Sequence, residues 1–212
     1  MGLFLKETNN QFTLGLWEIN ETIEDLLSKI NLNKEEKIIF ERFNNDTRKL
    51  HWLSYRNLLQ ELIPTKAYSH VNYDEFGKPY LHANQYHLSV SHSGIYSAAI
   101  ISRDFPVGID IEKTHPKIEK VVYKFLSQEE ISHIGELNRL EKFYICWGAK
   151  ESLYKIYGKK NLMFQEHILL HPFNYQKKGI FTGQIKIGDF NKEYPIYYEM
   201  LNDYMLVYAV GI

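Results

Sequence analysis

The chain has 212 residues with a formal net charge of −1, 44% of them hydrophobic and 24% charged. This composition predicts one compact unit or two small ones, and near-neutral charge argues against a general nucleic-acid binder. A single cysteine excludes an intrachain disulfide and a thiolate metal cluster. The apolar run at the N-terminus is too short for a signal peptide, and no segment approaches the ~20 apolar residues of a membrane span. We therefore expect a cytoplasmic protein.

The first half of the chain predicts helices followed by strands. Helical periodicity runs from Glu21 to Ile30 and from Lys34 to about Ile63. Asn33 is expected to cap the second helix with Glu36 as its capping-box partner, and Pro64 is expected to end it. After the turn-forming stretch YDEFGKPYL, the stretches HLSVSHSGIYSAAIIS and VGIDIEK predict neighbouring strands joined by a tight connection.

The second half repeats this order. Helical patterns are expected over 117–134 and 141–157, with Gly158 ending the latter helix. Short runs rich in Tyr, Ile and Val then predict antiparallel strands over 168–212. The order of helices, strands, helices and strands predicts an α+β fold of two similar halves that meet near residue 105.

The stretch VGIDIEK contains two carboxylates at strand spacing. The period of two places Val107, Ile109 and Ile111 on one face of the strand, and Asp110 and Glu112 on the other. Successive residues on one face lie roughly 6.5–7 Å apart, so the two carboxylates repel each other unless water or a cation separates them. Two interpretations are open: a solvated edge strand with an acidic outer face, or a metal site.

The stretch CWGAKESLYK places charges in an otherwise apolar helix. Glu151 and Lys155 share one stripe with Tyr144 and Gly148. A surface pair at this spacing contributes only ~0.2–0.5 kcal/mol, and an apolar helix is expected to be buried, where unpaired charge is costly. Gly148 costs roughly 1 kcal/mol of helix stability relative to alanine, which favours a close approach of another group there.

These residues together point to metal-assisted phosphate chemistry. Carboxylates are the ligands that Mg²⁺ prefers, and the three candidates are Asp110, Glu112 and Glu151. Lys155 beside them could neutralise phosphate charge or protonate a leaving group. The substrate is not identified by these residues alone.

Two motifs resemble the signature of the 4′-phosphopantetheinyl transferases. VGIDIE, followed some forty residues later by WGAKESLYK, is similar to the two-part signature of the larger, pseudo-dimeric, surfactin-synthetase-activating type. Two upstream blocks agree, Gly77-Lys78-Pro79 and Ser91-His92-Ser93, so the resemblance covers about residues 40–160. Gly148 departs from the pattern, because the family has a small hydroxyl or thiol residue there.

The resemblance implies a fold and a reaction. The fold would have two α/β halves, residues 1–105 with coenzyme A contacts and 106–212 with the catalytic residues. Each half would be an antiparallel sheet packed with helices; a pseudo-twofold axis would relate them, and the active site would lie in their cleft. The enzyme would transfer the phosphopantetheine arm of coenzyme A to a serine of an acyl or peptidyl carrier protein, releasing adenosine 3′,5′-bisphosphate with the help of Mg²⁺.

The resemblance also assigns roles to residues. Asp110, Glu112 and Glu151 would hold Mg²⁺, Glu151 would help to deprotonate the carrier serine, and Lys155 would stabilise or protonate the departing phosphate. The expected contacts with the coenzyme are Arg48, Lys49, Gly77, Lys78, Pro79, Ser91, His92 and Lys150. Without the resemblance, Lys78 would be a solvated turn lysine, Arg48 and Lys49 part of a solvated basic face, and His92 a structural histidine. A Ser–His hydrolase dyad in SHSG is disfavoured because adjacent strand residues point to opposite faces.

The expected partner is a carrier protein of fatty-acid, polyketide or nonribosomal peptide synthesis. It would dock near Lys117 to Leu126, where lysines alternate with apolar residues, because its recognition helix is acidic. Two similar halves in one chain favour a monomer. Two other hypotheses are a coenzyme- or carrier-binding protein without turnover and a magnesium-dependent phosphohydrolase. The preferred carrier, the pathway and the selectivity for free over acylated coenzyme A are left open.

Overall fold

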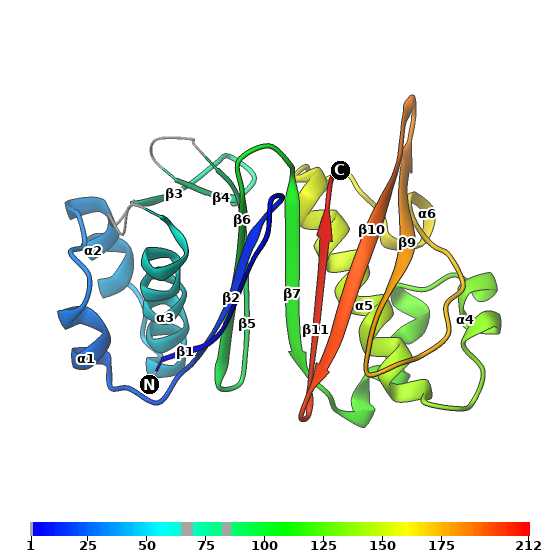
Figure 1. Ribbon diagram of the computed structural model, residues 1–212, viewed down its shortest axis with the longest axis horizontal. Coiled ribbons are helices and arrows are strands. Elements are labelled where there is room, and N and C mark those ends of the chain that lie inside the picture. The colour runs from blue at the N-terminus through cyan, green and yellow to red at the C-terminus, as the bar shows by residue number, and fades with distance from the viewer. Residues whose placement is uncertain (1, 65–69, 82–85) are drawn as a thin grey trace. The chain divides into compact units, whose positions relative to one another are not determined.

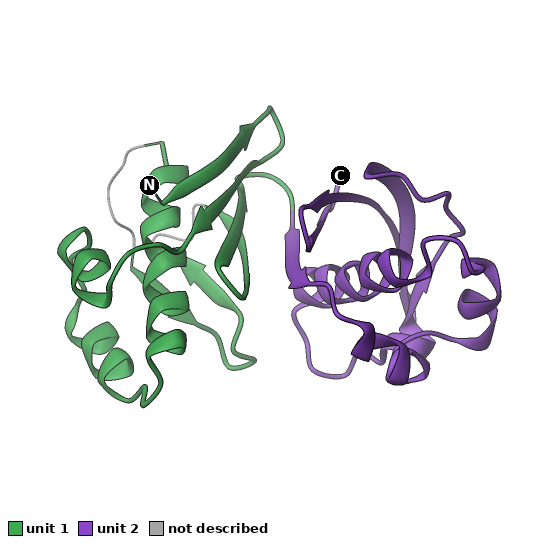
Figure 2. Cartoon of the chain, turned by 90° about the horizontal axis from the view of Figure 1, so that it is seen from below, with its two compact units in different colours: residues 1–105 green, residues 106–212 purple. Residues whose placement is uncertain are grey.

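The computed structural model describes residues 2–64, 70–81 and 86–212. The chain divides into two compact units, Met1–Phe105 and Pro106–Ile212 (Figure 2), with the same bounds as the two predicted halves. Both units combine antiparallel sheets with helices, so the predicted α+β class is confirmed. The pseudo-twofold relation between the halves stays a prediction.

In the first unit, helix α3 packs against one face of a four-stranded antiparallel sheet. The sheet has the order β1-β2-β6-β5, and the longest helix, α3, lies between this sheet and helix α1 (Figure 1). A separate two-stranded ladder, β3-β4, carries the FGKP turn. The elements are β1 Leu3–Thr8, β2 Thr13–Glu18, α1 Ile23–Ser28, α2 Lys34–Glu41, α3 Asp46–Leu62, β3 Val71–Tyr73, β4 Pro79–Leu81, β5 His87–Ser93 and β6 Tyr96–Ser102.

The predicted helix over 34–63 is two helices. Its start is confirmed, because the Asn33 side chain accepts from Glu36 N and the Glu36 side chain accepts from Asn33 N. The helix stops at Glu41, and α3 starts only after Asn45, whose side chain accepts from Arg48 N. The apolar pattern continues through this break, but the N-cap residue Asn45 has an extended backbone, so the helix cannot continue through it.

The second unit is a five-stranded antiparallel sheet of order β7-β11-β10-β9-β8, with helix α5 packed on β7 and β11 (Figure 1). The elements are β7 Val107–Lys113, the 3₁₀ turns η1 Pro116–Lys120 and η2 Val122–Lys124, α4 Gln128–Ile134, α5 Arg139–Tyr157, α6 Phe164–His167, β8 Ile168–Leu170, β9 Lys178–Ile187, β10 Phe190–Leu201 and β11 Tyr204–Val210.

Two predictions for this unit need correction, and one is confirmed. Strand β7 pairs with β11 and not with β6, so the tight connection before β7 joins two different sheets. The helix expected over 117–134 is two 3₁₀ turns and the short α4, because Ser127 forms a new capping box with Glu130. Gly158 ends α5 in the left-handed conformation, as predicted.

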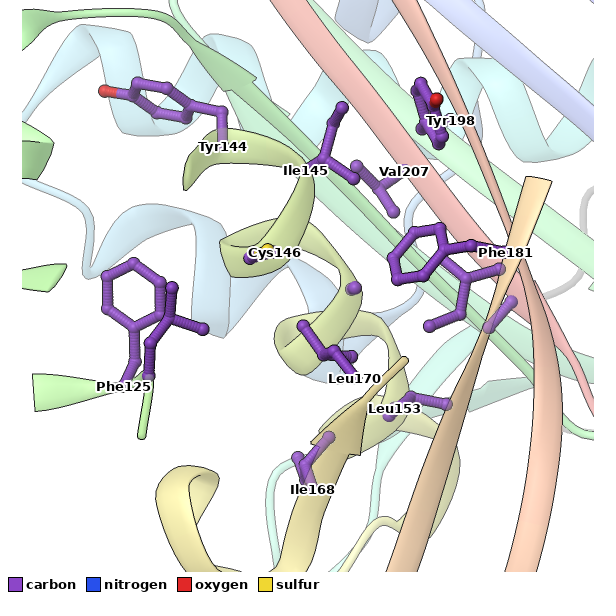
Figure 3. Packing of buried hydrophobic residues seen from close by; sticks show 14 of the residues in the cluster. Phe125, Tyr144, Ile145, Cys146, Leu153, Ile168, Leu170, Phe181, Tyr198 and Val207 are labelled. Atoms are coloured by element: carbon purple, nitrogen blue, oxygen red, sulfur yellow. The ribbon is translucent and has the colours of Figure 1, made fainter. Parts of the chain in front are cut away.

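Helix α5 is apolar on most of its circumference because it lies inside the core of the second unit. In Figure 3, Ile145 of α5 lies beside Val207 of β11, and Leu153 of α5 lies beside Leu170 of β8; all four belong to one buried cluster. Burial raises the pKa of the Cys146 thiol to about 12, so the cysteine is an inert core residue, as expected. None of the helices in the described ranges is long and apolar enough to cross a membrane.

Candidate active site

Strand β7 directs its two carboxylates toward helix α5. A Cβ atom on Gly108 would lie 1.9 Å from the backbone oxygen of Ser152 in α5, so this face of the strand meets the helix. Asp110 and Glu112 follow on the same face by the alternation of a strand. Asp110 is only 4% exposed. The interpretation as a solvated acidic face is therefore wrong for Asp110, even though β7 is an edge strand.

Helix α5 approaches the sheet closely at Gly148. A Cβ atom there would lie 2.6 Å from a methyl carbon of Val207, the β11 residue paired with Asp110. One turn later, the Ser152 hydroxyl donates to Val207 O at 3.2 Å. The glycine thus brings the following turns of the helix down onto the strand pair that holds Asp110, which is the close approach that the sequence predicted.

The charged stripe of α5 is fixed at its beginning by Tyr144. The Tyr144 hydroxyl accepts from His115 N at 3.0 Å and donates to His115 O at 3.2 Å, just after the end of β7. Burial, with Glu112 nearby, raises the pKa of this phenol. Sequence reasoning assigned Tyr144 no role, although its position on the stripe of Glu151 and Lys155 was a signal that it faces the acidic strand.

The side chain of Lys155 reaches from helix α5 to strand β7. Its ammonium donates to Asp110 Oδ1 at 2.9 Å and to Ile109 O at 2.7 Å. The side chain of Lys155 is 26% exposed and that of Asp110 is 6% exposed, so the pair sits at the boundary of the core. The pair connects strand and helix and is not the i,i+4 surface pair with Glu151.

Glu151 lies within electrostatic range of both strand carboxylates. Burial raises its pKa above the ordinary value, Lys155 opposes this rise, and the negative charges of Asp110 and Glu112 add to it. Mutual repulsion of this kind requires carboxylates that are close and incompletely screened. The structure therefore places Lys155 against Asp110, and Glu151 within electrostatic range of Asp110, Glu112 and Lys155.

These carboxylates fit a hard divalent cation by their chemistry, since oxygen ligands of this charge are the ones that Mg²⁺ takes. In the described part of the chain, however, no three His, Cys, Asp or Glu side chains are gathered closely enough to hold a metal ion as they stand. Here the Lys155 ammonium supplies the positive charge next to Asp110.

The prediction that Lys150 contacts the coenzyme is wrong for this structure. Its side chain is fully buried, and its ammonium donates to Glu130 Oε2 at 2.9 Å and to the carbonyls of Phe164 and Ile168 at 2.8 Å each. An ammonium has three donors, so all are used. Lys150 therefore holds α4, α6 and β8 to α5, and sequence reasoning missed its partner Glu130.

The FGKP block forms the turn between β3 and β4. The Asp74 side chain accepts from Phe76 N at 2.9 Å and from Lys78 N at 2.8 Å, and Gly77 has a φ of 86°. Burial lowers the pKa of Lys78, with Asp74 opposing the shift, so this lysine is not a fully solvated turn residue. Pro79 begins β4.

The SHS block lies at the end of β5. His92 is exposed, and its ring stacks on that of His51 from α3, with centroids 4.3 Å apart. Ser91 is half-buried and pairs in register with Ala98. Sequence reasoning did not single out His51, although its place on the helix that also holds the predicted basic residues was a signal.

Arg48 and Lys49 lie against aromatic rings near the start of α3. The Arg48 guanidinium is 4.7 Å from the Phe43 ring centroid, and the Lys49 ammonium is 5.7 Å from that of Phe40. At 100° per residue, Lys49 lies about 160° around the helix from His51, whereas Arg48 lies about 60° from it. Arg48 is therefore better placed than Lys49 to share a ligand with the His92 side of α3.

The predicted docking segment is amphipathic. Its apolar residues Ile118, Phe125 and Leu126 are buried in the core of the second unit. Its lysines are exposed, as are the two large residues Val121, 38% exposed, and Tyr123, 62% exposed. The segment thus presents a basic surface with an aromatic side chain, the kind of surface that an acidic helix would complement.

The second unit matches a known family. Residues 106–208 match the model of the 4′-phosphopantetheinyl transferase superfamily. A 4′-phosphopantetheinyl transferase of Bacillus subtilis is 36% identical over 89 residues, which are 40% of this chain and 39% of that protein. The Bacillus subtilis 4′-phosphopantetheinyl transferase ffp is 30% identical over 146 residues, 66% of this chain and 65% of that protein. The matched segments thus span less than two thirds of the length of these relatives. The second unit is thus similar to the 4′-phosphopantetheinyl transferases, and the charged site formed by β7 and α5 lies inside the matched residues.

Proposed function

We propose that the protein transfers the 4′-phosphopantetheine arm of coenzyme A to a serine of an apo acyl or peptidyl carrier protein and releases adenosine 3′,5′-bisphosphate. The observation that carries this proposal is the convergence of Asp110, Glu112 and Glu151 beside Lys155, with the pKa of Glu151 raised by burial and by the other two carboxylates. The match of residues 106–208 to the superfamily model and the names of the similar proteins support the same reaction.

In this reaction the serine hydroxyl attacks the phosphorus that carries pantetheine. A new P–O bond forms, and the bond to adenosine 3′,5′-bisphosphate breaks. Glu151, or a water that it orients, accepts the serine proton. A carboxylate with a raised pKa is the better base for this step, because base strength increases with pKa. The residue also lies on a helix that is fixed in the core, which favours accurate positioning.

Lys155 acts on the leaving group. Its ammonium now contacts Asp110 and a backbone carbonyl, and partial exposure leaves it room to turn toward a bound phosphate. There it would stabilise the departing phosphate or give it a proton, so that charge does not accumulate on the leaving oxygen. Magnesium, held by Asp110, Glu112 and Glu151, would supply further neutralisation of the diphosphate when bound.

The coenzyme contacts are assigned to the first unit. Lys78 and Arg48 offer positive charge, and His92 offers an exposed imidazole for the 3′-phosphate. Gly77 and Pro79 set the turn that holds Lys78, Ser91 precedes His92, and Lys49 is a weaker candidate. The carrier docks on the basic surface of residues 117–126.

One assay tests the proposal. The protein is incubated with coenzyme A, Mg²⁺ and an apo carrier protein, and the intact mass of the carrier is measured. A gain of one phosphopantetheine arm, lost when the acceptor serine of the carrier is replaced by alanine, is the expected result. Binding of coenzyme A without modification of the carrier would instead support a non-catalytic binding protein. Breakdown of the coenzyme with an unmodified carrier would support a phosphohydrolase.

A further inference from the structure

Two histidine rings stack at the junction of α3 with the β5–β6 hairpin. The rings of His51 and His92 have centroids 4.3 Å apart and planes inclined by 13°. Their surroundings differ, because His51 is only 8% exposed whereas His92 is exposed. The stack thus joins a buried ring to an exposed one.

The buried ring is held by a hydrogen bond as well as by packing. His51 Nε2 lies 2.8 Å from Gly94 O. A carbonyl oxygen only accepts, so Nε2 carries the proton and donates it. Gly94 has a φ of 54° and lies in the turn between β5 and β6. His51 therefore ties α3 to the turn that directly follows the strand of His92.

A second contact fixes the same place on the hairpin. Ser97 of β6 pairs in register with His92 of β5, and the Ser97 hydroxyl lies 2.7 Å from the Ser54 hydroxyl of α3. Ser54 is fully buried and lies one turn after His51. The helix thus contacts this pair of strand residues twice, once through the ring stack and once through a hydroxyl pair.

We infer that His51 is a positioning residue for His92, which it holds in one orientation before the ligand binds. The inference rests on the proposed function, in which His92 contacts the 3′-phosphate of coenzyme A. An exposed histidine on a strand has several side-chain rotamers, and ordering it on binding weakens affinity. The flat, buried face of His51 removes this freedom in advance. Because His51 is buried, we expect it to act on the ligand through His92.

The test compares coenzyme A with 3′-dephospho-coenzyme A as donors. With His51→Ala we expect KM for coenzyme A to rise roughly fivefold with kcat within about twofold of wild type, the size expected for loss of one side chain's preorganisation. KM for the dephospho donor should not change. His51→Phe keeps a ring under His92 and should stay within about twofold of wild type. If His51→Phe raises KM for coenzyme A as much as His51→Ala does, ring stacking is not the cause of the effect.

A double variant shows whether His51 acts through His92. His92→Ala should raise KM for coenzyme A selectively, and His51→Ala with His92→Ala should raise it no further. The control is Ser54→Ala, which removes the neighbouring contact of α3 with the hairpin and should leave the preference between the two donors unchanged. The inference is overturned if the increases in KM caused by the two substitutions multiply in the double variant. It is also overturned if His51→Ala changes KM equally for both donors.

A binding measurement separates this inference from the proposed reaction. Adenosine 3′,5′-bisphosphate is titrated into the protein while the imidazole signals of His92 are followed by NMR, with no carrier present. We expect the ligand to shift the His92 signals and to bind roughly fivefold more weakly to His51→Ala. If both results are obtained but the protein modifies no carrier, the proposed reaction is wrong and the positioning role of His51 is kept. A modified carrier with equal binding to wild type and His51→Ala would remove the role of His51 alone.

Discussion

Two lysines of helix α5, Lys150 and Lys155, lie five residues apart in the sequence and have opposite surroundings. Lys150 is fully buried and faces one carboxylate, Glu130, so positive and negative charge are balanced there. Lys155 is 26% exposed at a site that also holds Asp110, Glu112 and Glu151, so negative charge is in excess. Balanced, fully hydrogen-bonded charge fixes a fold, whereas an unbalanced site near solvent attracts a cation. We therefore assign Lys150 to stability and Lys155 to chemistry.

The largest effect is expected for Glu151→Gln. The change keeps the shape of the side chain but removes the proposed base and one ligand of the ion, so kcat for carrier modification should fall on the order of 100- to 10,000-fold. The thermal midpoint should not fall, since a half-buried charge that is repelled by two carboxylates is removed. The readout is the rate of gain in carrier mass at limiting Mg²⁺.

The matched control for this variant is Glu129→Gln, an exposed carboxylate at the start of α4 in the same unit. It should modify the carrier at the wild-type rate. Unchanged activity of Glu151→Gln at limiting Mg²⁺ would remove Glu151 from the mechanism. The assignment of a chemical role to the site of Lys155 would then lose its main support.

Next in size is Lys150→Met, which leaves the Glu130 carboxylate buried without its ammonium. Loss of one partner of a buried pair costs about 3–5 kcal/mol in the free energy of unfolding. Burial already lowers the pKa of Lys150, opposed by Glu130, which shows how closely the two depend on each other. Denaturant unfolding measures the loss.

Adding Glu130→Gln to this variant removes the unpaired charge and should restore part of the stability. The backbone amides of Ser127 and Leu170 donate to different oxygens of Glu130, and glutamine keeps only one acceptor oxygen, so the recovery should be partial. A loss below about 1 kcal/mol for Lys150→Met, or no recovery in the double variant, would contradict the structural role of Lys150.

The sequence predicted features that depend on neighbouring residues. The capping box of Asn33, the C-terminal Gly158, the alternation in β7 and the stripe of Glu151 and Lys155 are all local patterns, because each depends on residues within a few turns. The close approach at Gly148 was also readable, since a glycine inside a helix is unfavourable unless something must come near.

Other features depend on contacts between distant segments, and the sequence did not predict them. Strand β7 pairs with β11, almost a hundred residues later, and no local pattern identifies that partner. Lys150 and Lys155 look alike in the motif, and only the fold places Glu130, twenty residues earlier, against one of them. The stack of His51 on His92 likewise joins a helix to a strand that apolar periodicity cannot pair.

A smaller loss of stability is expected for Lys155→Met than for Lys150→Met. The variant removes the ammonium from Asp110 and Ile109 O, a charged hydrogen-bonding interaction that contributes about 1.5–3 kcal/mol. Water can reach this site because Lys155 is partly exposed. The same denaturant unfolding experiment measures both variants. If Lys155→Met is as destabilising as Lys150→Met, the division between a structural and a chemical lysine is wrong.

The smallest effect is the pH dependence of stability that Glu151 contributes. Its pKa is raised in the folded protein from the ordinary value of 4.5, because burial and the charges of Asp110 and Glu112 disfavour the carboxylate. Between the ordinary and the raised pKa the folded state therefore binds more protons than the unfolded state, and stability decreases as pH rises through this window. Each unit of pKa difference corresponds to about 1.4 kcal/mol.

Subtracting the stability of Glu151→Gln from that of wild type at each pH isolates this contribution, because the other carboxylates titrate in both proteins. The difference should be most favourable to wild type below about pH 4.5, where Glu151 is protonated in both states, and should fall as the pH rises toward neutral. Mg²⁺ should reverse the fall at neutral pH by binding the charged form, and the variant should gain little from the ion. If this stability difference instead rises with pH in the absence of Mg²⁺, the protein stabilises Glu151 as a carboxylate. Positive and negative charge would then be as balanced around Lys155 as they are around Lys150.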